Sequence, residues 1–308
     1  MEQSWLAIIV SLIAVVFVFL FAINKFSRQI EYIFGPRFKN LMERFTNTPI
    51  KGFLVGAGVT SVLQSSTAVT VMLVSLVDAG LLSFGNSVGV IIGSNVGTTL
   101  TTQLVAFKVL NLAPYILVLG FILMNVKNKY QHFGKAIFYF GLVFSSLFII
   151  SVLSGSFKES ELFISLISKT SNVFIAVIVG FFASTILQSS FMAASLVIIL
   201  AGDGLLNLPQ ALGIILGTNI GTTTTALLAS IVTGKQGKRV ATAHFLFNFI
   251  GVLIFLPFIG VFSRFINSID INLTGQVAIS HLIFNLIIAV IFILLIKPFT
   301  ALVQKLIR

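Results

Sequence analysis

Gln64-Ser65-Ser66 stands at the centre of an otherwise apolar run, 52–78, and the same tripeptide recurs as Gln188-Ser189-Ser190 at the centre of a second run, 176–202. Each run has 27 residues. Two membrane-spanning helices joined by a turn need about 40 residues. A run of this length, folded back on itself, makes two half-helices of about 20 Å each. The sequence therefore predicts two re-entrant hairpins whose tips lie near the middle of a bilayer.

The two runs belong to a longer internal repeat. Residues 56–107 align with 180–231 at a constant offset of 124, without a gap and with 18 identities in 52 positions. The identities cluster in polar segments: G-S-N-V-G-T-T at 93–99 falls on G-T-N-I-G-T-T at 217–223. Shared apolar composition would match leucines by chance, but it would not match such clusters, so we infer a duplicated structural unit.

Composition places the chain in a membrane. It is 57% hydrophobic and only 9% charged, whereas soluble domains carry about 25% charged residues. We predict an all-α membrane protein with a single transmembrane transport domain, 1–308. The seven predicted full spans are 5–23, 84–107, 111–126, 134–154, 208–231, 240–262 and 275–297.

Basic residues set the predicted topology. With these spans, 15 of the 19 Lys and Arg residues fall on one side, which the positive-inside rule makes cytoplasmic. The N-terminus is then outside and the C-terminus inside, and topology explains the net charge of +11 without a nucleic-acid partner. Three spans separate the hairpins, so the hairpins enter from opposite sides. Inverted repeats, about 1–126 and 127–263 with 275–297 as an extra span, are typical of secondary transporters.

Four uncharged polar clusters are predicted to meet at mid-membrane depth, two at the hairpin tips and two around Asn95 and Asn219. Glycines flank both asparagines, so we expect the helices to unwind there. Unwinding would release carbonyls for a hard cation and N–H groups for an oxyanion. The alternative is that small and polar residues only pack and join helices. That alternative is preferred for any single residue, but the duplicated constellation favours a substrate site.

The paired Q-S-S and G-[ST]-N-[VI]-G-T-T segments resemble the type II sodium-dependent phosphate cotransporter family. The resemblance implies cotransport of sodium ions and inorganic phosphate by alternating access across the cell membrane, with sodium as coupling ion and no other cofactor. It also implies the residues that bind substrate and ions: Gln64, Ser65, Ser66, Thr67, Ser94, Asn95, Thr98, Thr99, Gln188, Ser189, Ser190, Thr218, Asn219, Thr222 and Thr223.

The chain departs from this family where many members read Q-S-S-S. The fourth position is Thr67 in one repeat and Phe191 in the other. We expect the first hairpin to supply more ion ligands, the second to shape the site sterically, and Phe191→Ser to be tolerated. Some bacterial relatives carry a soluble regulatory domain after the membrane part, and a form without it is expected because the sequence ends at Arg308.

Other functions were weighed against phosphate transport. A transporter of another small anion and, less favoured, a passive ion channel remain alternatives, as do all oligomeric states. An enzyme is not expected, because the sequence has no cysteine, no P-loop motif and no metal-ligand spacing. Two H-x-x-F-N segments, 244–248 and 281–285, are candidates either for a proton or substrate role or for joining helices.

Overall fold

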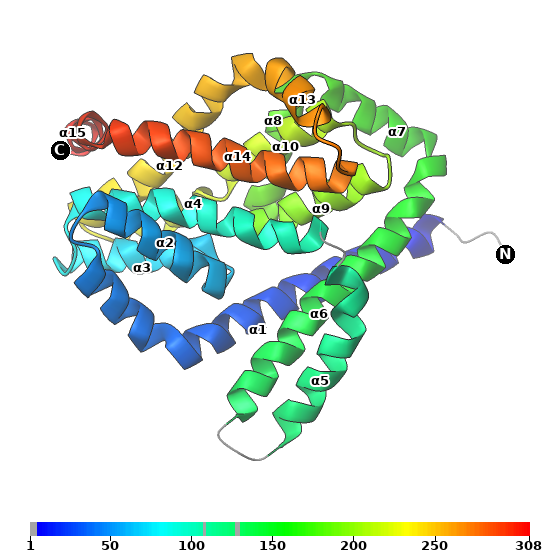
Figure 1. The fold of residues 1–308 in the computed structure, drawn as a ribbon, viewed down its shortest axis with the longest axis horizontal. Helices are drawn as coiled ribbons and strands as arrows, with labels where there is room; N and C mark the ends of the chain where they lie inside the picture. The colour runs from blue at the N-terminus through cyan, green and yellow to red at the C-terminus, as the bar shows by residue number, and fades with distance from the viewer. Residues whose placement is uncertain (1–4, 107–108, 127–129) are drawn as a thin grey trace.

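The computed structural model describes residues 5–106, 109–126 and 130–308, and the described residues form helices joined by short turns (Figure 1). The predicted end of one span at residue 107 and the predicted start of the second repeat at residue 127 lie outside the described residues. The α-helices are α1 Trp5–Phe45, α2 Pro49–Leu63, α3 Ser66–Asp78, α4 Phe84–Ala106, α5 Ala113–Asn125, α6 Gln131–Ser154, α7 Glu161–Ser168, α8 Val173–Leu187, α9 Ser190–Gly202, α10 Leu208–Gly221, α11 Thr224–Ser230, α12 Lys235–Phe255, α13 Ile259–Asn267, α14 Leu273–Leu294 and α15 Ile296–Leu306.

Six helices within the described residues are long and apolar enough to cross a membrane. They match six of the seven predicted spans, with α10 and α11 together forming one and α12 and α13 another. The exception is 111–126, because the helical stretch there, Leu110–Asn125, is shorter than a span. The count reaches seven only if α7 and α8, bent by 114°, are taken as one span.

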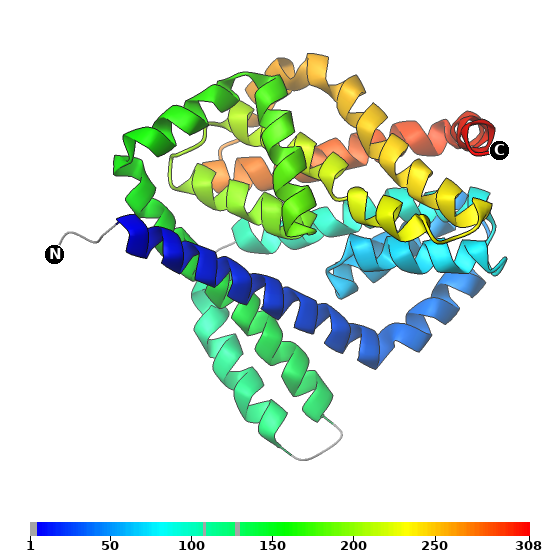
Figure 2. The ribbon, with the colours of Figure 1, turned by 180° about the vertical axis from the view of Figure 1, so that it is seen from behind.

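Helices α5 and α6 form an antiparallel pair that projects from the rest of the molecule (Figures 1 and 2). Backbone meets backbone at Gly120 against Phe138 and at Gly141 against Leu117. Helix α1 crosses the molecule beside this pair and bends in its second half, where Pro36 interrupts the helical hydrogen bonding (Figure 2). The predicted span 5–23 is thus the first part of a helix of 41 residues.

Both predicted hairpins are present as a helix, a break and a second helix. Gln64 and Gln188 break the helices by adopting the left-handed conformation, with φ of 58° and 51°. In the first unit, Gly89 of α4 packs on Pro49 and Gly97 packs on Ala57, so α2 and α4 run in the same direction. Helix α3, which joins them, must therefore run back. The second unit repeats the pattern, with Gly180 of α8 on Ile214 and Phe181 on Gly221 of α10.

The hairpins open toward opposite ends of the molecule. Helix α3 ends at Asp78, whose carboxylate accepts hydrogen bonds from Gly234 and Gly237 at the start of α12. Helix α9 ends at Gly202, which packs on Thr274 at the start of α14. Helices α12 and α14 are antiparallel, since their ring pairs are Phe247–Phe292 and Phe255–Phe284. The predicted inverted arrangement of the two hairpin units is confirmed.

The expected unwinding at the asparagines is wrong for the first repeat. Helix α4 is continuous through Asn95. A Cβ on Gly93 would overlap the carbonyl of Phe53, and one on Gly217 would overlap the carbonyl of Val177. These glycines are therefore needed for close packing of helix backbones rather than for unwinding. In the second repeat the helix is disturbed one turn later than expected, at Thr222 and Thr223 between α10 and α11.

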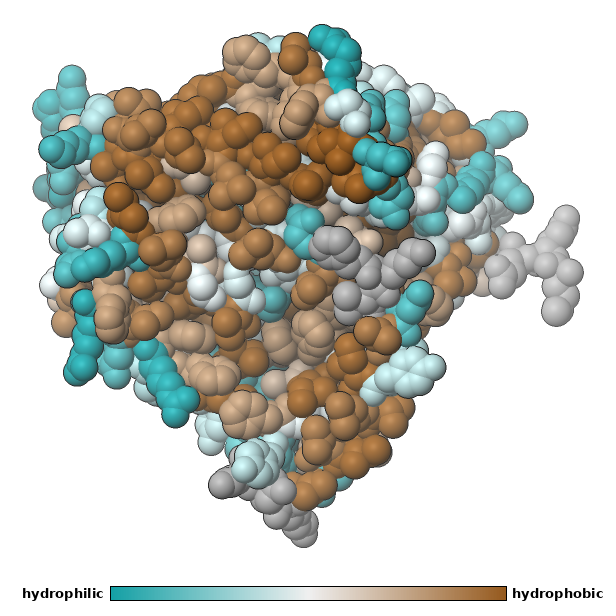
Figure 3. Space-filling model, viewed as in Figure 1, coloured by the Kyte–Doolittle hydropathy of each residue, from teal (hydrophilic) through white to brown (hydrophobic). Residues whose placement is uncertain are grey.

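The surface fits a bilayer. Large apolar side chains are exposed on several helices, among them Leu119 on α5, Phe182 on α8 and Val290 on α14. Figure 3 shows hydrophobic residues covering much of the visible face, with hydrophilic residues gathered toward its edges. Helix α1 begins at one end of the molecule and α15 lies at the other (Figure 1). The protein is a multi-pass membrane protein.

Candidate functional site

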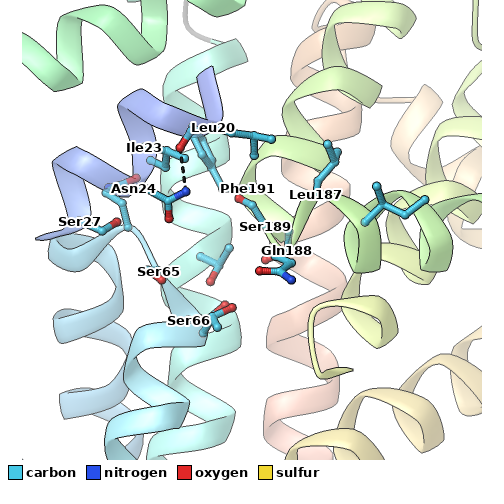
Figure 4. Close-up of a pocket in the computed structure, with 15 residues that line it drawn as sticks. Leu20, Ile23, Asn24, Ser27, Ser65, Ser66, Leu187, Gln188, Ser189 and Phe191 are labelled. Atoms are coloured by element: carbon cyan, nitrogen blue, oxygen red, sulfur yellow. Dashed lines mark hydrogen bonds between the residues drawn. The ribbon is translucent and has the colours of Figure 1, made fainter. Parts of the chain in front are cut away.

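The two hairpin tips share one cavity of about 250 Å³. Figure 4 shows Ser65 and Ser66 of the first tip across from Gln188 and Ser189 of the second, with α1 along one side. No described residue that lines the cavity has an ionisable side chain. The lining residues are Leu20, Ile23, Asn24, Ser27, Gln64, Ser65, Ser66, Thr67, Thr98, Ile186, Leu187, Gln188, Ser189, Ser190 and Phe191.

Each tip is built in the same way from its Q-S-S sequence. The glutamine takes the left-handed conformation that ends one helix, and the first serine begins the next. Ser65 Oγ accepts from the Ala68 N–H at 3.1 Å, and Ser189 Oγ accepts from the Met192 N–H at 3.2 Å. Serine is a favoured N-cap residue because its oxygen satisfies one free N–H of the first turn. The polar tripeptide thus specifies both the break and the restart of the helix.

Each tip also leaves backbone donors free. In the described part of the chain, the N–H groups of Ser66 and Thr67 in α3, and of Ser190 and Phe191 in α9, have no hydrogen-bond partner. All four residues line the cavity. First-turn N–H groups point out of a helix along its axis, and a helix N-terminus carries a partial positive charge. Two such ends meeting at one cavity, together with serine hydroxyls, make a donor-rich site suited to an oxyanion.

Of the fifteen residues predicted for the site, eight line this cavity. They are Gln64, Ser65, Ser66, Thr67, Thr98, Gln188, Ser189 and Ser190. The other seven lie buried along α4 and at the end of α10. They are Ser94, Asn95, Thr99, Thr218, Asn219, Thr222 and Thr223. Most of them bond within the protein: Ser94 Oγ accepts from Thr60, and Asn95 donates to the carbonyl of Ile91. The structure therefore splits the predicted set into a cavity group and an interior group.

Sequence reasoning missed the contribution of α1. Leu20, Ile23, Asn24 and Ser27 complete the cavity wall. Their spacing places them on one face of a helix, with two polar side chains just after an apolar run. This stripe can be seen in the sequence, but only the tertiary structure shows which part of the protein it faces.

The fourth position of the motif differs between the tips, as the sequence indicates. Thr67 is partly buried, and its hydroxyl has no partner in the described residues. Phe191 is 3% exposed, and its ring stacks on Phe19 of α1 with 6.1 Å between centroids. The second tip is thus held against α1 by an apolar contact, while Phe191 also lines the cavity.

Comparisons with known proteins agree with this architecture. The chain is 29% identical over 265 residues to the uncharacterized protein YqeW of Bacillus subtilis, covering 85% of this chain and 86% of that protein. It is 26% identical over 235 residues to the putative inorganic phosphate export protein YjbB of Escherichia coli, covering 75% of this chain and 43% of YjbB. It therefore spans under half the length of YjbB.

A shorter segment of 85 residues is 40% identical to the sodium-dependent phosphate transport protein 2C of Rattus norvegicus, covering 26% of this chain and 14% of that protein. No solved structure matches the chain. The model of the Na+/Pi-cotransporter family matches residues 18–152 and 157–297, which include both hairpin units and α14. The match takes in nearly all of the membrane helices, and the chain belongs to the Na+/Pi-cotransporter family.

Proposed function

We propose that the protein transports inorganic phosphate across the cell membrane, coupled to sodium ions, by alternating access. The observation that carries this proposal is the pair of opposed helix N-termini whose free N–H groups line one cavity. Phosphate supplies the acceptor oxygens that these donors lack. Helix N-termini bind phosphate through the combination of free N–H groups and helix dipole.

The lack of positive charge in the cavity supports coupling to sodium. The described lining has no cationic side chain to balance a phosphate dianion. Helix ends carry only partial charges of about half an elementary charge each. A dianion held in such a site is costly unless cations accompany it. A cotransported sodium ion provides that charge and ties phosphate movement to the sodium gradient.

Inverted hairpin units support alternating access, because each unit reaches the shared cavity from a different end of the molecule. We place the N-terminus outside and the C-terminus in the cytoplasm, from the distribution of basic residues. A Lys235→Cys variant checks this orientation. The cysteine should react with an impermeant maleimide only after the cytoplasmic face is opened, and labelling of intact cells would refute the orientation.

Labelled phosphate flux in proteoliposomes tests the function. We expect uptake with an inward sodium gradient and none when potassium or choline replaces sodium. Unlabelled phosphate should compete, whereas sulfate at the same concentration should not, which separates phosphate transport from transport of another small anion. Equal flux in all three media would contradict sodium coupling.

A further inference from the structure

A groove of about 610 Å³, here called the α1–α2 groove, lies between the second half of α1 and helix α2. It shares no lining residue with the cavity at the hairpin tips. Phe45 of α1 and Leu54 and Val62 of α2 line it and are exposed, so the groove opens on the outer surface of the protein. Among the described residues that line it, Lys51 alone has a charged side chain, and the others are apolar or glycine.

The groove exists because α1 bends. At its inner end, the Ser27 hydroxyl of α1 donates to the Leu63 carbonyl of α2 at 3.2 Å. At the other end, α1 stops at Phe45 and α2 begins at Pro49. Between these points α1 bends near Pro36, and its second half reaches the start of α2 at an angle (Figure 1). The two helices are thus tied at both ends and leave the groove between them.

The wall that α2 provides has a defined polarity and length. Lys51, Leu54, Gly58 and Val62 follow one another at spacings of three and four residues, so they share one face of the helix. The helix rises about 16 Å from Lys51 to Val62, and one leaflet of a bilayer has about 15 Å of hydrocarbon. The groove therefore has a cation at one end and apolar surface over the depth of a single leaflet.

Further basic residues gather at the Lys51 end of the groove. Arg44 lies in the last turn of α1, next to the start of α2. The segment 37–51 contains four basic residues against one acidic residue, a net charge of +3. In the described part of the chain its one ion pair joins Lys39 to Glu43, at 3.9 Å, so Arg44 and Lys51 have no carboxylate partner there. This end of the groove attracts an anionic group.

Gly58 keeps the middle of the groove open. A Cβ on Gly58 would meet no atom within 4 Å, whereas one on Gly56 would overlap the Val90 carbonyl of α4. Glycine inside a helix costs about 1 kcal/mol relative to alanine. Close backbone packing accounts for a glycine at position 56 but not for Gly58. The space beside Gly58 is therefore available to a ligand.

The matching face of the second unit lacks both features. At the constant offset of 124, Ile175 of α8 stands in place of Lys51, and Phe182 stands in place of Gly58. Both side chains are exposed. Helix α8 therefore presents an unbroken apolar face without a cation. It also shows that a helix of this unit accommodates an aromatic ring at the position of Gly58.

We propose that the α1–α2 groove binds one anionic phospholipid. Its phosphate group lies at Lys51 and Arg44, and one acyl chain runs past Gly58 as far as Val62. Basic side chains beside a membrane segment recognise anionic lipids of the cytoplasmic leaflet, and the basic side of this protein is the one we place in the cytoplasm. A lipid phosphate meets the positive charge at this end, which the apolar face of another helix would not. This binding does not involve the phosphate cavity and goes beyond the proposed transport function.

The test separates the headgroup from the acyl chain. The purified full chain in a non-ionic detergent is titrated with phosphatidylglycerol or phosphatidylcholine, and thermal unfolding is followed. Phosphatidylglycerol should stabilise the wild type at lower concentration than phosphatidylcholine. Lys51→Gln should raise the half-saturating concentration of phosphatidylglycerol about fivefold, the effect of one basic residue near anionic lipid, and leave that of phosphatidylcholine unchanged. Lys39→Gln, which removes a charge of the same segment outside the groove lining, should change neither.

Gly58→Phe tests the path of the acyl chain. It fills the groove in the way that Phe182 fills the matching place on α8, so stabilisation by both lipids should be lost. Lys51→Gln, at an exposed position, decides the proposal if this variant does not fold.

Four results would overturn the proposal. Equal affinity of the wild type for the two lipids, or an equal loss of phosphatidylglycerol affinity in Lys39→Gln, would refute a headgroup site at Lys51. Undiminished stabilisation of Gly58→Phe would refute the groove as the place of the acyl chain. A wild-type dimer in detergent that Gly58→Phe converts into a monomer would show that a second copy of the chain, and not a lipid, occupies the groove.

Discussion

The two hairpin units share their backbone packing but differ in their buried polar contacts. In both, a hydroxyl one turn before the tip donates to a helix carbonyl at 3.3 Å, Ser61 to Gly97 and Thr185 to Gly221. Among the described residues, only the first unit adds a buried side-chain bond between its hairpin and its supporting helix, from Thr60 to Ser94 at 2.9 Å. At the matching place in the second unit, Ser184 is buried without a partner. The duplication has thus kept the geometry that brings the tips together, while the pairing of this buried hydroxyl differs between the units.

The helices that pack against the two hairpins, α4 and α10, also differ from each other. Helix α4 continues without interruption through its G-S-N-V-G-T-T segment, whereas α10 ends at Gly221 and restarts as α11 at Thr224. Both supporting helices pack against α14, through Gln103 of α4 and Asn219 of α10. A regular helix satisfies its own carbonyls, and in the described residues it is the second unit that departs from this regularity.

The largest losses of stability should come from substitutions in the backbone packing that the two units share. Gly93→Ala and Gly217→Ala each place a methyl group onto a backbone carbonyl of the paired helix, which cannot move aside as a side chain can. We expect each to destabilise the protein by more than about 3 kcal/mol, at or beyond the upper range for overpacking. Thermal unfolding in detergent measures this. Gly58→Ala, where a Cβ meets nothing within 4 Å, is the control, and equal melting temperatures for all three variants would contradict the packing role.

The next largest loss of stability is expected at the second tip and not at the first. Sequence comparison alone favours tolerance of Phe191→Ser, but the ring is 3% exposed and stacked on Phe19. We therefore expect a loss of about 3 kcal/mol, because deletion of a buried ring leaves a cavity. Thr67→Ser, the same change at the first tip, should be neutral. Unfolding measurements on the pair decide the matter, and wild-type stability of Phe191→Ser would show that the stack does not hold the second tip.

A smaller effect is expected at the first tip. Thr67→Val removes one hydroxyl from the cavity and preserves the side-chain volume. The sequence favours a sodium ligand here, whereas the free N–H groups beside this hydroxyl favour phosphate. We expect the KM for phosphate to rise about tenfold, the usual consequence of losing one hydrogen bond to a charged ligand. Flux titrations against phosphate and against sodium distinguish the two, since a shift confined to the sodium titration would restore the sodium assignment.

The smallest change in stability is expected from removing single buried hydroxyls, one with a hydrogen-bond partner and one without. Thr60→Val leaves the Ser94 hydroxyl without its partner and should cost about 1 kcal/mol. Ser184→Ala removes a hydroxyl that has no partner and should be neutral or stabilising by up to about 1 kcal/mol. Thermal unfolding should show a loss of stability for Thr60→Val and no loss for Ser184→Ala. A clear destabilisation by Ser184→Ala would mean that this hydroxyl is bonded in the membrane.

Sequence patterns located the tips correctly because the information is local. Left-handed Gln64 and Gln188 and the N-capping Ser65 and Ser189 coincide with the centres of the two apolar runs. The patterns misassigned the glycines around Asn95, since a flexible residue and a small residue look identical in one sequence. They also gave 111–126 a full span, although the helical stretch that forms there, Leu110–Asn125, is shorter than the six membrane-spanning helices.

The sequence by itself determined the membrane class, the duplicated unit and the residues of the two tips. These depend on hydropathy along the chain and on short-range backbone preferences. Only the tertiary structure decided which polar residues meet. It brought Thr98 of α4 and Asn24 of α1 to the cavity, and it placed Asn219 against His281, 62 residues away. The reason is physical: which face a helix presents to its neighbours depends on close packing across distant segments, and in a largely apolar sequence no local pattern fixes that rotation.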